Sequence, residues 1–271
     1  MSLRVRLRFS KLGKVRFTSH RDTARCWERA LRRAELPVAY SEGFSPRPKV
    51  SFGLALSTGH ESLGEYLDVD LATAPDSVDV DALPARLDPA LPAGIAVQGA
   101  AVVPPGTPSL QEAVTSCRWR LEVVDADPGE VDAAVERLLA ADQLLVQRER
   151  KGRPVELDLR PALLHLALAG PTPAGTELVA ELATQPTAAR PGEVVAALCA
   201  GLAGASGGRV CRTHQFTGAA AERREPLPSP PGFDGWSLAA TARPAPDRME
   251  GLPDVRRTHD PALAGGPIST G

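Results

Sequence analysis

Apolar and charged residues alternate at the start of the chain and predict a β-strand. Residues 3–9 read LRVRLRF, so every second side chain is apolar and the arginines lie between them. A period of two is typical of a strand with one buried face. We expect the arginine face of this strand to be exposed to solvent and cationic.

The pattern then changes to the period of a helix and back to that of strands. Ser19 and Asp22 have a spacing close to that of a capping box, and Pro37 ends the apolar periodicity, which predicts a helix over residues 20–35. The elements expected after it are strands near 50–56 and 65–71, a short helix over 78–87 and a strand over 95–103. This β-α-β-β-α-β order is that of the split ferredoxin-like motif.

A similar order recurs in the next hundred residues. The expected elements are a strand over 117–124, a helix over 128–141, strands over 155–169 and 176–184, a helix over 192–202 and a strand over 210–216. We therefore expect an α+β protein with two tandem ferredoxin-like domains, residues 1–104 and 105–217, joined at the Pro- and Gly-containing stretch 104–108. Residues 218–271 contain 9 Pro and 7 Gly with little periodicity, and we expect them to be disordered.

The net charge of −2 hides two oppositely charged blocks. Residues 1–50 contain 13 Lys and Arg against 4 Asp and Glu, whereas residues 51–112 contain 1 against 9. The basic block is a candidate surface for an anionic partner such as RNA. The two blocks can also neutralise each other, because Asp68 and Asp70 lie on a strand that is expected to neighbour the first.

Other classes of protein are disfavoured by the sequence. No run of about 18 apolar residues is present, and the N-terminus lacks the apolar core of a signal peptide, so we expect a cytoplasmic protein with no membrane segment. The cysteines are widely scattered, which supports neither a zinc ribbon nor an iron–sulfur motif. We expect buried, reduced thiols and no cofactor in this chain; the cysteines are Cys26, Cys117, Cys199 and Cys211.

Arginines recur along one side of the helix predicted over residues 20–35. At 100° per residue they share one face, opposite the side that carries Trp27 and Leu31. Such a stripe can neutralise successive phosphates. The alternative is a solvated helix face in which Glu28 pairs with Arg32. The candidate RNA-binding residues of this stripe are Arg21, Arg25, Arg29 and Arg32, together with Lys14 just before the helix.

His20 and Asp22, at the start of the same helix, are the candidate catalytic residues. A histidine beside a basic patch can position a phosphate or act as general acid or base in RNA cleavage. The alternative is that both residues only cap the helix, as Ser19 is expected to do.

A second histidine, His60, is followed by Glu61 and, four residues later, Glu65. Histidines with carboxylates can bind a metal. However, nothing in their spacing brings His20 and His60 together, so we expect no metal site and leave the role of these residues open.

The loop GFSPRP at residues 43–48 has a restricted backbone. Pro46 and Pro48 fix two φ angles, and Gly43 allows an unusual one. Phe44 can then stack on a base while Arg47, with Lys49 nearby, binds its phosphate. The alternative is that Phe44 packs in the core and the prolines only shape a connection.

The long stretch from Phe17 to Leu71 closely resembles the radical-SAM-linked protein family, a bacterial domain of unknown function encoded beside, or fused behind, radical SAM proteins that often carry a cobalamin-binding domain. The family-typical residues intact here are Phe17, Ser19, His20, Asp22, Arg25, Arg29, Ala30, Arg33, Pro37, Gly43, Phe44, Pro46, Pro48, Phe52, Gly59, Glu61 and Glu65. The resemblance implies a radical SAM partner, which would hold the iron–sulfur cluster, S-adenosylmethionine and cobalamin.

Three functions follow from these observations. The leading hypothesis is a non-catalytic accessory protein that binds or presents tRNA or rRNA to a radical SAM enzyme. The second is a metal-independent endoribonuclease that uses His20. The third is a protein-interaction module without RNA binding, in which the acidic stretch from Glu61 to Asp88, which includes Glu65 and Asp68, docks the partner.

Overall fold

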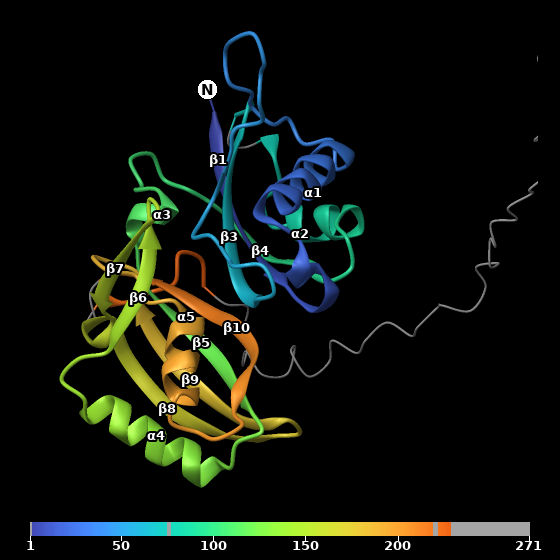
Figure 1. Cartoon of the computed structure of the whole chain (residues 1–271). Helices are drawn as coiled ribbons and strands as arrows, with labels where there is room; N and C mark the ends of the chain where they lie inside the picture. The colour runs from blue at the N-terminus through green and yellow to red at the C-terminus, as the bar shows by residue number, and fades with distance from the viewer. Residues whose placement is uncertain (1, 75–76, 219–221, 229–271) are drawn as a thin grey trace, which may run out of the picture.

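Most of the described strands form one large mixed sheet, accompanied by few helices, so the protein is α+β. The structure is a computed structural model that describes residues 2–74, 77–218 and 222–228. The order of strands across the sheet is β4-β1-β3-β10-β5-β9-β8, and β2 pairs with β3 beside this path. Figure 1 shows two lobes, one carrying α1 and α2 and the other carrying α4 and α5.

The first lobe forms because the alternating apolar side chains of β1 face the apolar side of α1. Trp27 is fully buried, and its ring meets the ring of Phe9 edge-on at 4.9 Å. The elements of this lobe are β1 (Leu3–Lys11), η1 (Gly13–Phe17), α1 (His20–Arg33), β2 (Val50–Phe52), β3 (Glu61–Leu71), α2 (Leu83–Leu87), η3 (Asp88–Ala90) and β4 (Ile95–Val102).

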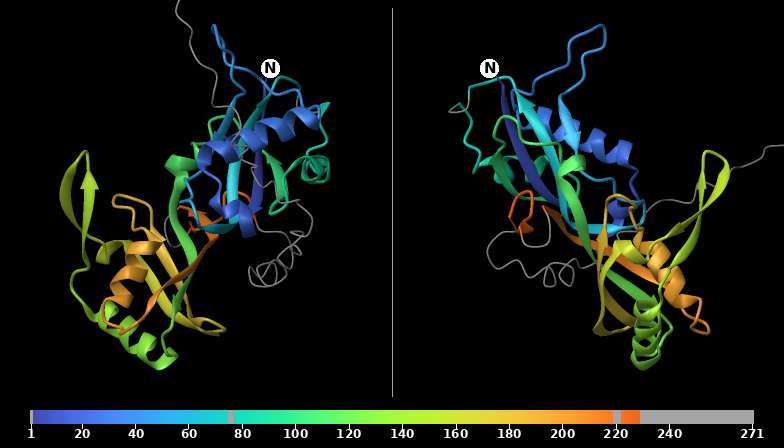
Figure 2. Two further views of the ribbon diagram at one scale, coloured as in Figure 1. Left: turned by 45° about the vertical axis from the view of Figure 1, so that its right-hand side comes forward. Right: turned by 90° about the vertical axis from the view of Figure 1, so that its left-hand side faces the viewer.

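The second lobe has a separate apolar core, in which α4 and α5 pack on β5, β8, β9 and β10. Its elements are α3 (Leu110–Ala113), β5 (Val114–Val124), α4 (Pro128–Ala140), β6 (Leu145–Arg150), β7 (Arg153–Asp158), η4 (Arg160–Ala162), β8 (Leu163–Thr172), β9 (Gly175–Ala183), α5 (Pro191–Cys199) and β10 (Ser206–Thr217). The single strand predicted over 155–169 is therefore wrong. The first residues of that predicted strand belong to β7, which forms a hairpin with β6, and the later residues belong to β8 of the large sheet. The β6–β7 hairpin stands apart from the large sheet in Figure 2.

The two lobes are joined through the sheet itself. Strands β3 and β10 run parallel, and Cys211 and Arg212 are paired with Glu61 and Ser62. The hydroxyl of Ser62 also donates to the main-chain oxygen of Arg212 at 3.2 Å. Two separate tandem ferredoxin-like domains are therefore not confirmed, because the strands make one continuous sheet.

The arginines of β1 do not form the exposed cationic face that the alternation predicts. Strands β1 and β3 are antiparallel with Arg4 opposite Asp70 and Arg6 opposite Asp68. Both arginines bind their partner through two nitrogens, and the Arg6 pair is buried. The alternative expectation, in which the basic and acidic blocks neutralise each other, is confirmed for these two pairs.

Part of the segment expected to be disordered packs on the sheet. The carboxylate of Glu225 binds Arg8 at 2.6 Å, and the hydroxyl of Tyr66 donates to the main-chain oxygen of Leu227 at 3.2 Å. The expectation of disorder from residue 218 is thus wrong for residues 222–228. The remainder of that prediction, residues 219–221 and 229–271, lies outside the described residues.

The four cysteines are free thiols; Cys117 and Cys211 are buried, while Cys26 and Cys199 are half-buried. Burial raises the pKa of Cys117 to about 11 and that of Cys211 to about 12. Among the described residues, no helix is long and apolar enough to cross a membrane.

Candidate nucleic-acid interface

The predicted site residues lie on α1, on the loop that follows it in the chain and at the start of β3, and a small cavity lies at the N-terminal end of α1. The helix begins at His20 because Ser19 caps it: the Ser19 hydroxyl oxygen accepts from the main-chain nitrogen of Asp22 at 3.1 Å. The same hydroxyl donates to the Asp22 carboxylate at 2.7 Å. This bond, with the nearby charge of Arg25, lowers the pKa of Asp22. Asp22 therefore belongs to the helix cap, as the alternative interpretation expected.

The arginine stripe of α1 is exposed. Arg25 contacts Asp22 at 3.4 Å across one helical turn, a weak pair at the surface. No ion pair joins Glu28 to Arg32, and Arg21, Arg29 and Arg32 have no carboxylate partner among the described residues. Unlike the arginines of β1, these guanidinium groups are available to an external anion.

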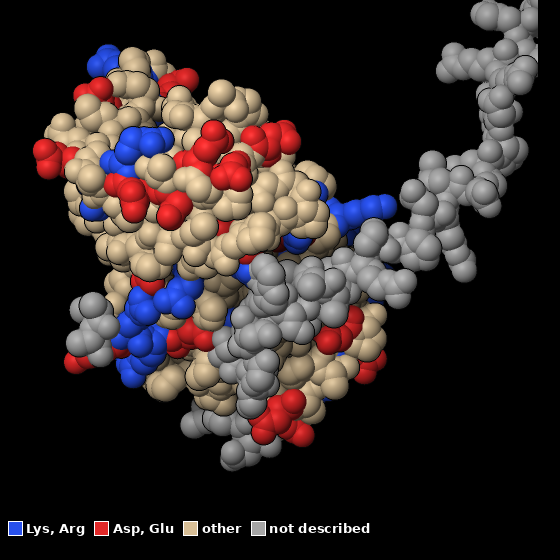
Figure 3. All heavy atoms as spheres, turned by 90° about the horizontal axis from the view of Figure 1, so that it is seen from below, with Lys and Arg blue, Asp and Glu red and all other residues tan. Residues whose placement is uncertain are grey.

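The lower face of the protein is not uniformly basic. In the view from below, Lys and Arg side chains are interspersed with Asp and Glu over the visible face (Figure 3). The stripe of α1 is therefore not part of a basic field that covers this face.

Residues 41–48 form a loop that projects from the end of the first lobe (Figure 1). Its base is anchored to β3: Ala39 donates to the main-chain oxygen of Asp70 at 2.7 Å, and Asp70 donates to that of Lys49 at 3.0 Å. Ser41 and Arg47 close the loop, because the Ser41 nitrogen donates to the Arg47 main-chain oxygen at 2.8 Å and the Arg47 nitrogen donates to the Ser41 hydroxyl at 3.0 Å.

The ring of Phe44 is fully exposed on this loop, and Arg47 and Lys49 are exposed as well. The alternative in which Phe44 packs in the core is therefore wrong. Gly43 has a φ of 125°, which favours glycine at that position, and Pro46 and Pro48 follow it. The loop and the residue that follows it thus expose an aromatic ring and two cationic side chains to solvent.

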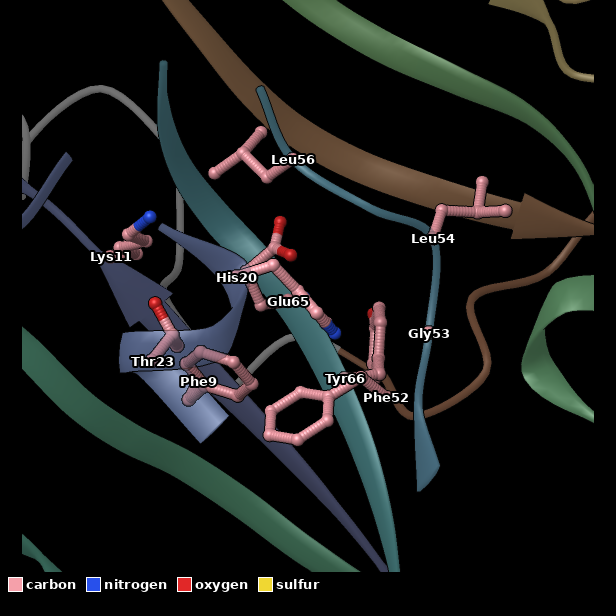
Figure 4. A pocket seen from close by; sticks show the side chains of 10 residues that line it. All are labelled: Phe9, Lys11, His20, Thr23, Phe52, Gly53, Leu54, Leu56, Glu65 and Tyr66. Carbon is pink, nitrogen blue, oxygen red and sulfur yellow. The ribbon is translucent and has the colours of Figure 1, made fainter. Parts of the chain in front are cut away.

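A cavity of about 20 Å³, enough for roughly one water molecule, lies at the N-terminal end of α1. Lys11, His20 and Glu65 line it together with Phe52, as Figure 4 shows. The rings of His20 and Phe52 meet edge-on at 5.1 Å. The structure therefore brings the candidate residues His20 and Glu65 to one cavity, together with Lys11. His20 itself is exposed at the mouth of this cavity.

Lys11 also lines this cavity, although the sequence indicated it only as one of the basic residues that precede the helix. Lys11 is the last residue of β1, and its side chain is buried. Its ammonium nitrogen donates to the main-chain oxygen of Thr18 at 3.0 Å. Burial lowers the pKa of Lys11, while the charge of Glu65 acts in the opposite direction. The burial of Lys11 could not be predicted, because a lysine at the end of an alternating strand is expected to lie at the surface.

Glu65 is held by an arginine from the other end of the chain. Arg212, fully enclosed on β10, binds the two carboxylate oxygens of Glu65 at 2.6 and 2.7 Å and also donates to the main-chain oxygen of Leu54 at 2.9 Å. No local pattern around residue 212 indicates this partner, because the contact depends on β10 lying beside β3.

His60 and Glu61 do not join His20 at one site. The ring of His60 meets Trp119 edge-on at 6.1 Å, and burial, followed by the charge of Arg212, lowers the pKa of His60. Glu61 is buried and binds Arg209 at 2.6 Å and Arg16 at 3.4 Å. In the described part of the chain, no group of three His, Cys, Asp or Glu residues could hold a metal ion.

Only part of the acidic stretch predicted over residues 61–88 is exposed. Glu61, Glu65 and Asp68 are buried and bind arginines of this chain. A protein partner that docks on this stretch would have to use its exposed carboxylates, such as Asp79, Asp81 and Asp88.

Comparisons with known proteins give a family but no activity. A sequence model of the family described as "Uncharacterized protein conserved in bacteria (DUF2344)" matches residues 4–191. No curated protein matches the chain. A solved structure of an unknown protein from Galdieria sulphuraria is 13% identical, with a TM-score of 0.23, and covers 78% of this chain and 99% of that one. Another, a putative glycine cleavage system transcriptional repressor, is 8% identical, with a TM-score of 0.22 and the same coverage. Such low TM-scores carry no argument about fold or function.

Proposed function

This chain belongs to an uncharacterized protein family conserved in bacteria (DUF2344), and we propose that it is a cytoplasmic RNA-binding accessory protein. The observation that carries the proposal is the exposed arginine stripe of α1, in which Arg21, Arg29 and Arg32 have no ion pair with a carboxylate among the described residues, together with the exposed ring of Phe44 on the loop that follows this helix in the chain.

This combination fits the chemistry of an RNA strand. Arginine forks bind phosphate oxygens through two nitrogens, and a line of them along a helix follows successive phosphates. An exposed aromatic ring gives an unpaired base a stacking surface, while the neighbouring cations of Arg47 and Lys49 can bind the backbone. A helix face that is only solvated does not explain why the loop after α1 exposes an aromatic ring.

The same proposal includes a radical SAM enzyme as the partner. It is supported by the resemblance of residues 17–71 to the radical-SAM-linked family, and it assigns the iron–sulfur cluster, S-adenosylmethionine and cobalamin to that partner. On this account the present chain binds tRNA or rRNA and presents it for modification, without catalysing a reaction itself.

We also propose that the sheet is a fusion of two ferredoxin-like units. The strand order is β4-β1-β3, with β2 on the other side of β3, in the first lobe and β10-β5-β9-β8 in the second. Each unit has a helix after its first strand and another before its last, which is the order of the split β-α-β motif.

The RNA-binding surface is tested by reversing charge on the stripe. The variant R21E/R25E/R29E should lose affinity for structured RNA, and its binding should depend less on salt because fewer counterions are released. The matched control is R137E/K151E/R153E, which makes the same change of charge at exposed positions of the second lobe. If both variants bind RNA as the unaltered protein does, the proposed surface is wrong.

A second function, a metal-independent endoribonuclease, is favoured by one observation: His20 lies at the mouth of the cavity that Lys11 and Glu65 also line. A histidine there, exposed at the surface, could exchange a proton with an RNA hydroxyl. This function requires that the protein cleave RNA and that His20→Ala abolish the cleavage. Cleavage at an unchanged rate by the variant would exclude His20 as its catalyst.

A further inference from the structure

A hollow of about 350 Å³, lined by residues of both lobes, lies where the two lobes meet. Arg16 and Phe17 line it from η1, Gly207 and Arg209 line it from β10, and Glu61 forms part of its floor. Small-molecule sites in proteins begin at about 300 Å³. The hollow is therefore large enough for a ligand, unlike the cavity beside His20.

Phe17 is the aromatic residue that lines this hollow. It is 61% exposed, which is unusual for a phenylalanine. The guanidinium of Arg16 lies over one face of the ring, 4.6 Å from its centre. Since Arg16 is itself bound to Glu61, the ring is held in place before any ligand arrives, which lowers the entropy cost of binding.

Two family-typical residues without an assigned role fix η1 in this position. The buried carboxylate of Glu61 accepts from the main-chain nitrogen of Gly13 at 2.7 Å. The main-chain nitrogen of Gly59 donates to the main-chain oxygen of Arg16 at 2.8 Å, and Gly59 has a φ of 89°, where a side chain would be strained. Both residues thus act on the position of Arg16 and Phe17.

The second lobe supplies a cation and bare backbone. Arg209 binds Glu61 at 2.6 Å, yet 55% of its side chain is exposed. Gly207 and Gly208 beside it present no side chain to the hollow, and a Cβ atom at Gly208 would come within 2.7 Å of a methyl group of Val124. Glu122 lines the same space; its carboxylate oxygens accept from the Thr172 hydroxyl at 2.8 Å and from the Arg209 main-chain nitrogen at 3.0 Å, and each has a second lone pair for an N–H group of a base edge.

We propose that this hollow binds one unpaired nucleotide of RNA, with the base stacked on the free face of Phe17 and the phosphate on Arg209. The inference rests on the proposed RNA-binding function and adds a specific site to it: the stripe of α1 binds the backbone of the RNA, and the junction between the lobes takes a single base. Stacking on an aromatic ring and a guanidinium on phosphate are the interactions that single-strand binders combine.

The test measures binding of the four nucleoside 5′-monophosphates to the full chain by titration calorimetry. The unaltered protein should bind at least one of them, and Phe17→Ala should weaken that binding by at least about fivefold, while Phe17→Tyr should keep it because the ring remains. Arg209→Gln should weaken the monophosphate but not the corresponding nucleoside. Phe17 and Arg209 are both exposed, and thermal unfolding of each variant checks that the fold is retained.

Two control variants separate this inference from the proposed function. Phe44→Ala and R21E/R25E/R29E change the other surface and should leave monophosphate binding intact. If the stripe variant binds structured RNA normally while Phe17→Ala loses the monophosphate, the proposed surface is wrong and the nucleotide site stands. Absence of monophosphate binding at millimolar concentration, or binding that Phe17→Ala leaves unchanged, overturns the nucleotide site.

Discussion

The same residue type has opposite roles on two neighbouring elements of this protein. Arginines alternate along β1 and repeat along α1, and in the sequence both sets look exposed and basic. On β1 each arginine faces a carboxylate, Asp70, Asp68 or Glu225, and is neutralised. On α1 the residues facing outward are solvent-exposed, because no strand lies on that side of the helix. Function at the residue scale therefore depends on which arginines have a partner within the chain.

The cap of α1 gives a prediction about stability. Replacing Ser19 by alanine removes the acceptor for the main-chain nitrogen of Asp22, and it should lower the free energy of unfolding by about 1 kcal/mol. Urea denaturation measures this change. Ser45→Ala, in the exposed loop, is the control and should have almost no effect; equal stability of the Ser19 variant and the unaltered protein would contradict the assigned cap.

Asp22 gives a prediction about pH. Its pKa is lowered in the folded protein by the Ser19 hydroxyl and then by Arg25, so its stabilising effect is present above the pKa of an unfolded aspartate and is lost as the pH falls through the folded value. The stability difference between the unaltered protein and Asp22→Asn should thus shrink between about pH 5 and pH 2. In a Ser19→Ala background the same substitution should show a weaker pH dependence, since the main cause of the shift is gone.

At the scale of elements, the helix and the loop were predicted from local patterns because local chemistry determines them. Ser19 caps α1 and Pro37 follows its end, while Gly43, Pro46 and Pro48 shape the loop without help from distant residues. The exposure of Phe44 was left open, since an aromatic residue between glycine and proline can point either way. Only the anchoring of the loop base to Asp70 on β3 determines that its tip stands clear of the core.

The loop gives a prediction about binding. Phe44→Ala should weaken affinity for a single-stranded oligoribonucleotide by about 1 to 3 kcal/mol, the value of one base stacked on an aromatic ring. Fluorescence anisotropy with a labelled oligonucleotide measures it. Phe44→Trp should retain the affinity, and a loss in both variants would mean that the loop shape, not the ring, is what matters.

At the scale of the whole molecule, the sequence could not predict the contacts that join the lobes. The order of most strands and helices follows from their periodicity, but the pairing of β3 with β10 brings together residues about 150 positions apart along the chain. Three ion pairs depend on that arrangement: Glu65 with Arg212, Glu61 with Arg209 and Arg8 with Glu225. For this reason Glu61 and Glu65 looked like part of a docking surface, although they bind arginines of the second lobe.

The Glu65–Arg212 pair gives a prediction for this junction. Replacing Arg212 by glutamine leaves a buried carboxylate without its main partner and should lower the free energy of unfolding by about 3 to 5 kcal/mol. The matched control is Arg4→Gln, because the Arg4–Asp70 pair lies half in solvent and should contribute less than about 1 kcal/mol. Similar losses in the two variants would mean that the buried pair has no special role.

The central claim, that α1 and loop 41–48 bind RNA, is tested most directly by ultraviolet crosslinking of the protein in its own cells, followed by purification and mass spectrometry of peptides that carry a nucleotide. The account predicts a discrete RNA species, crosslinks within residues 20–49 and a radical SAM protein in the same preparation. Purification of the partner with no RNA attached, or crosslinks confined to the second lobe, would contradict it.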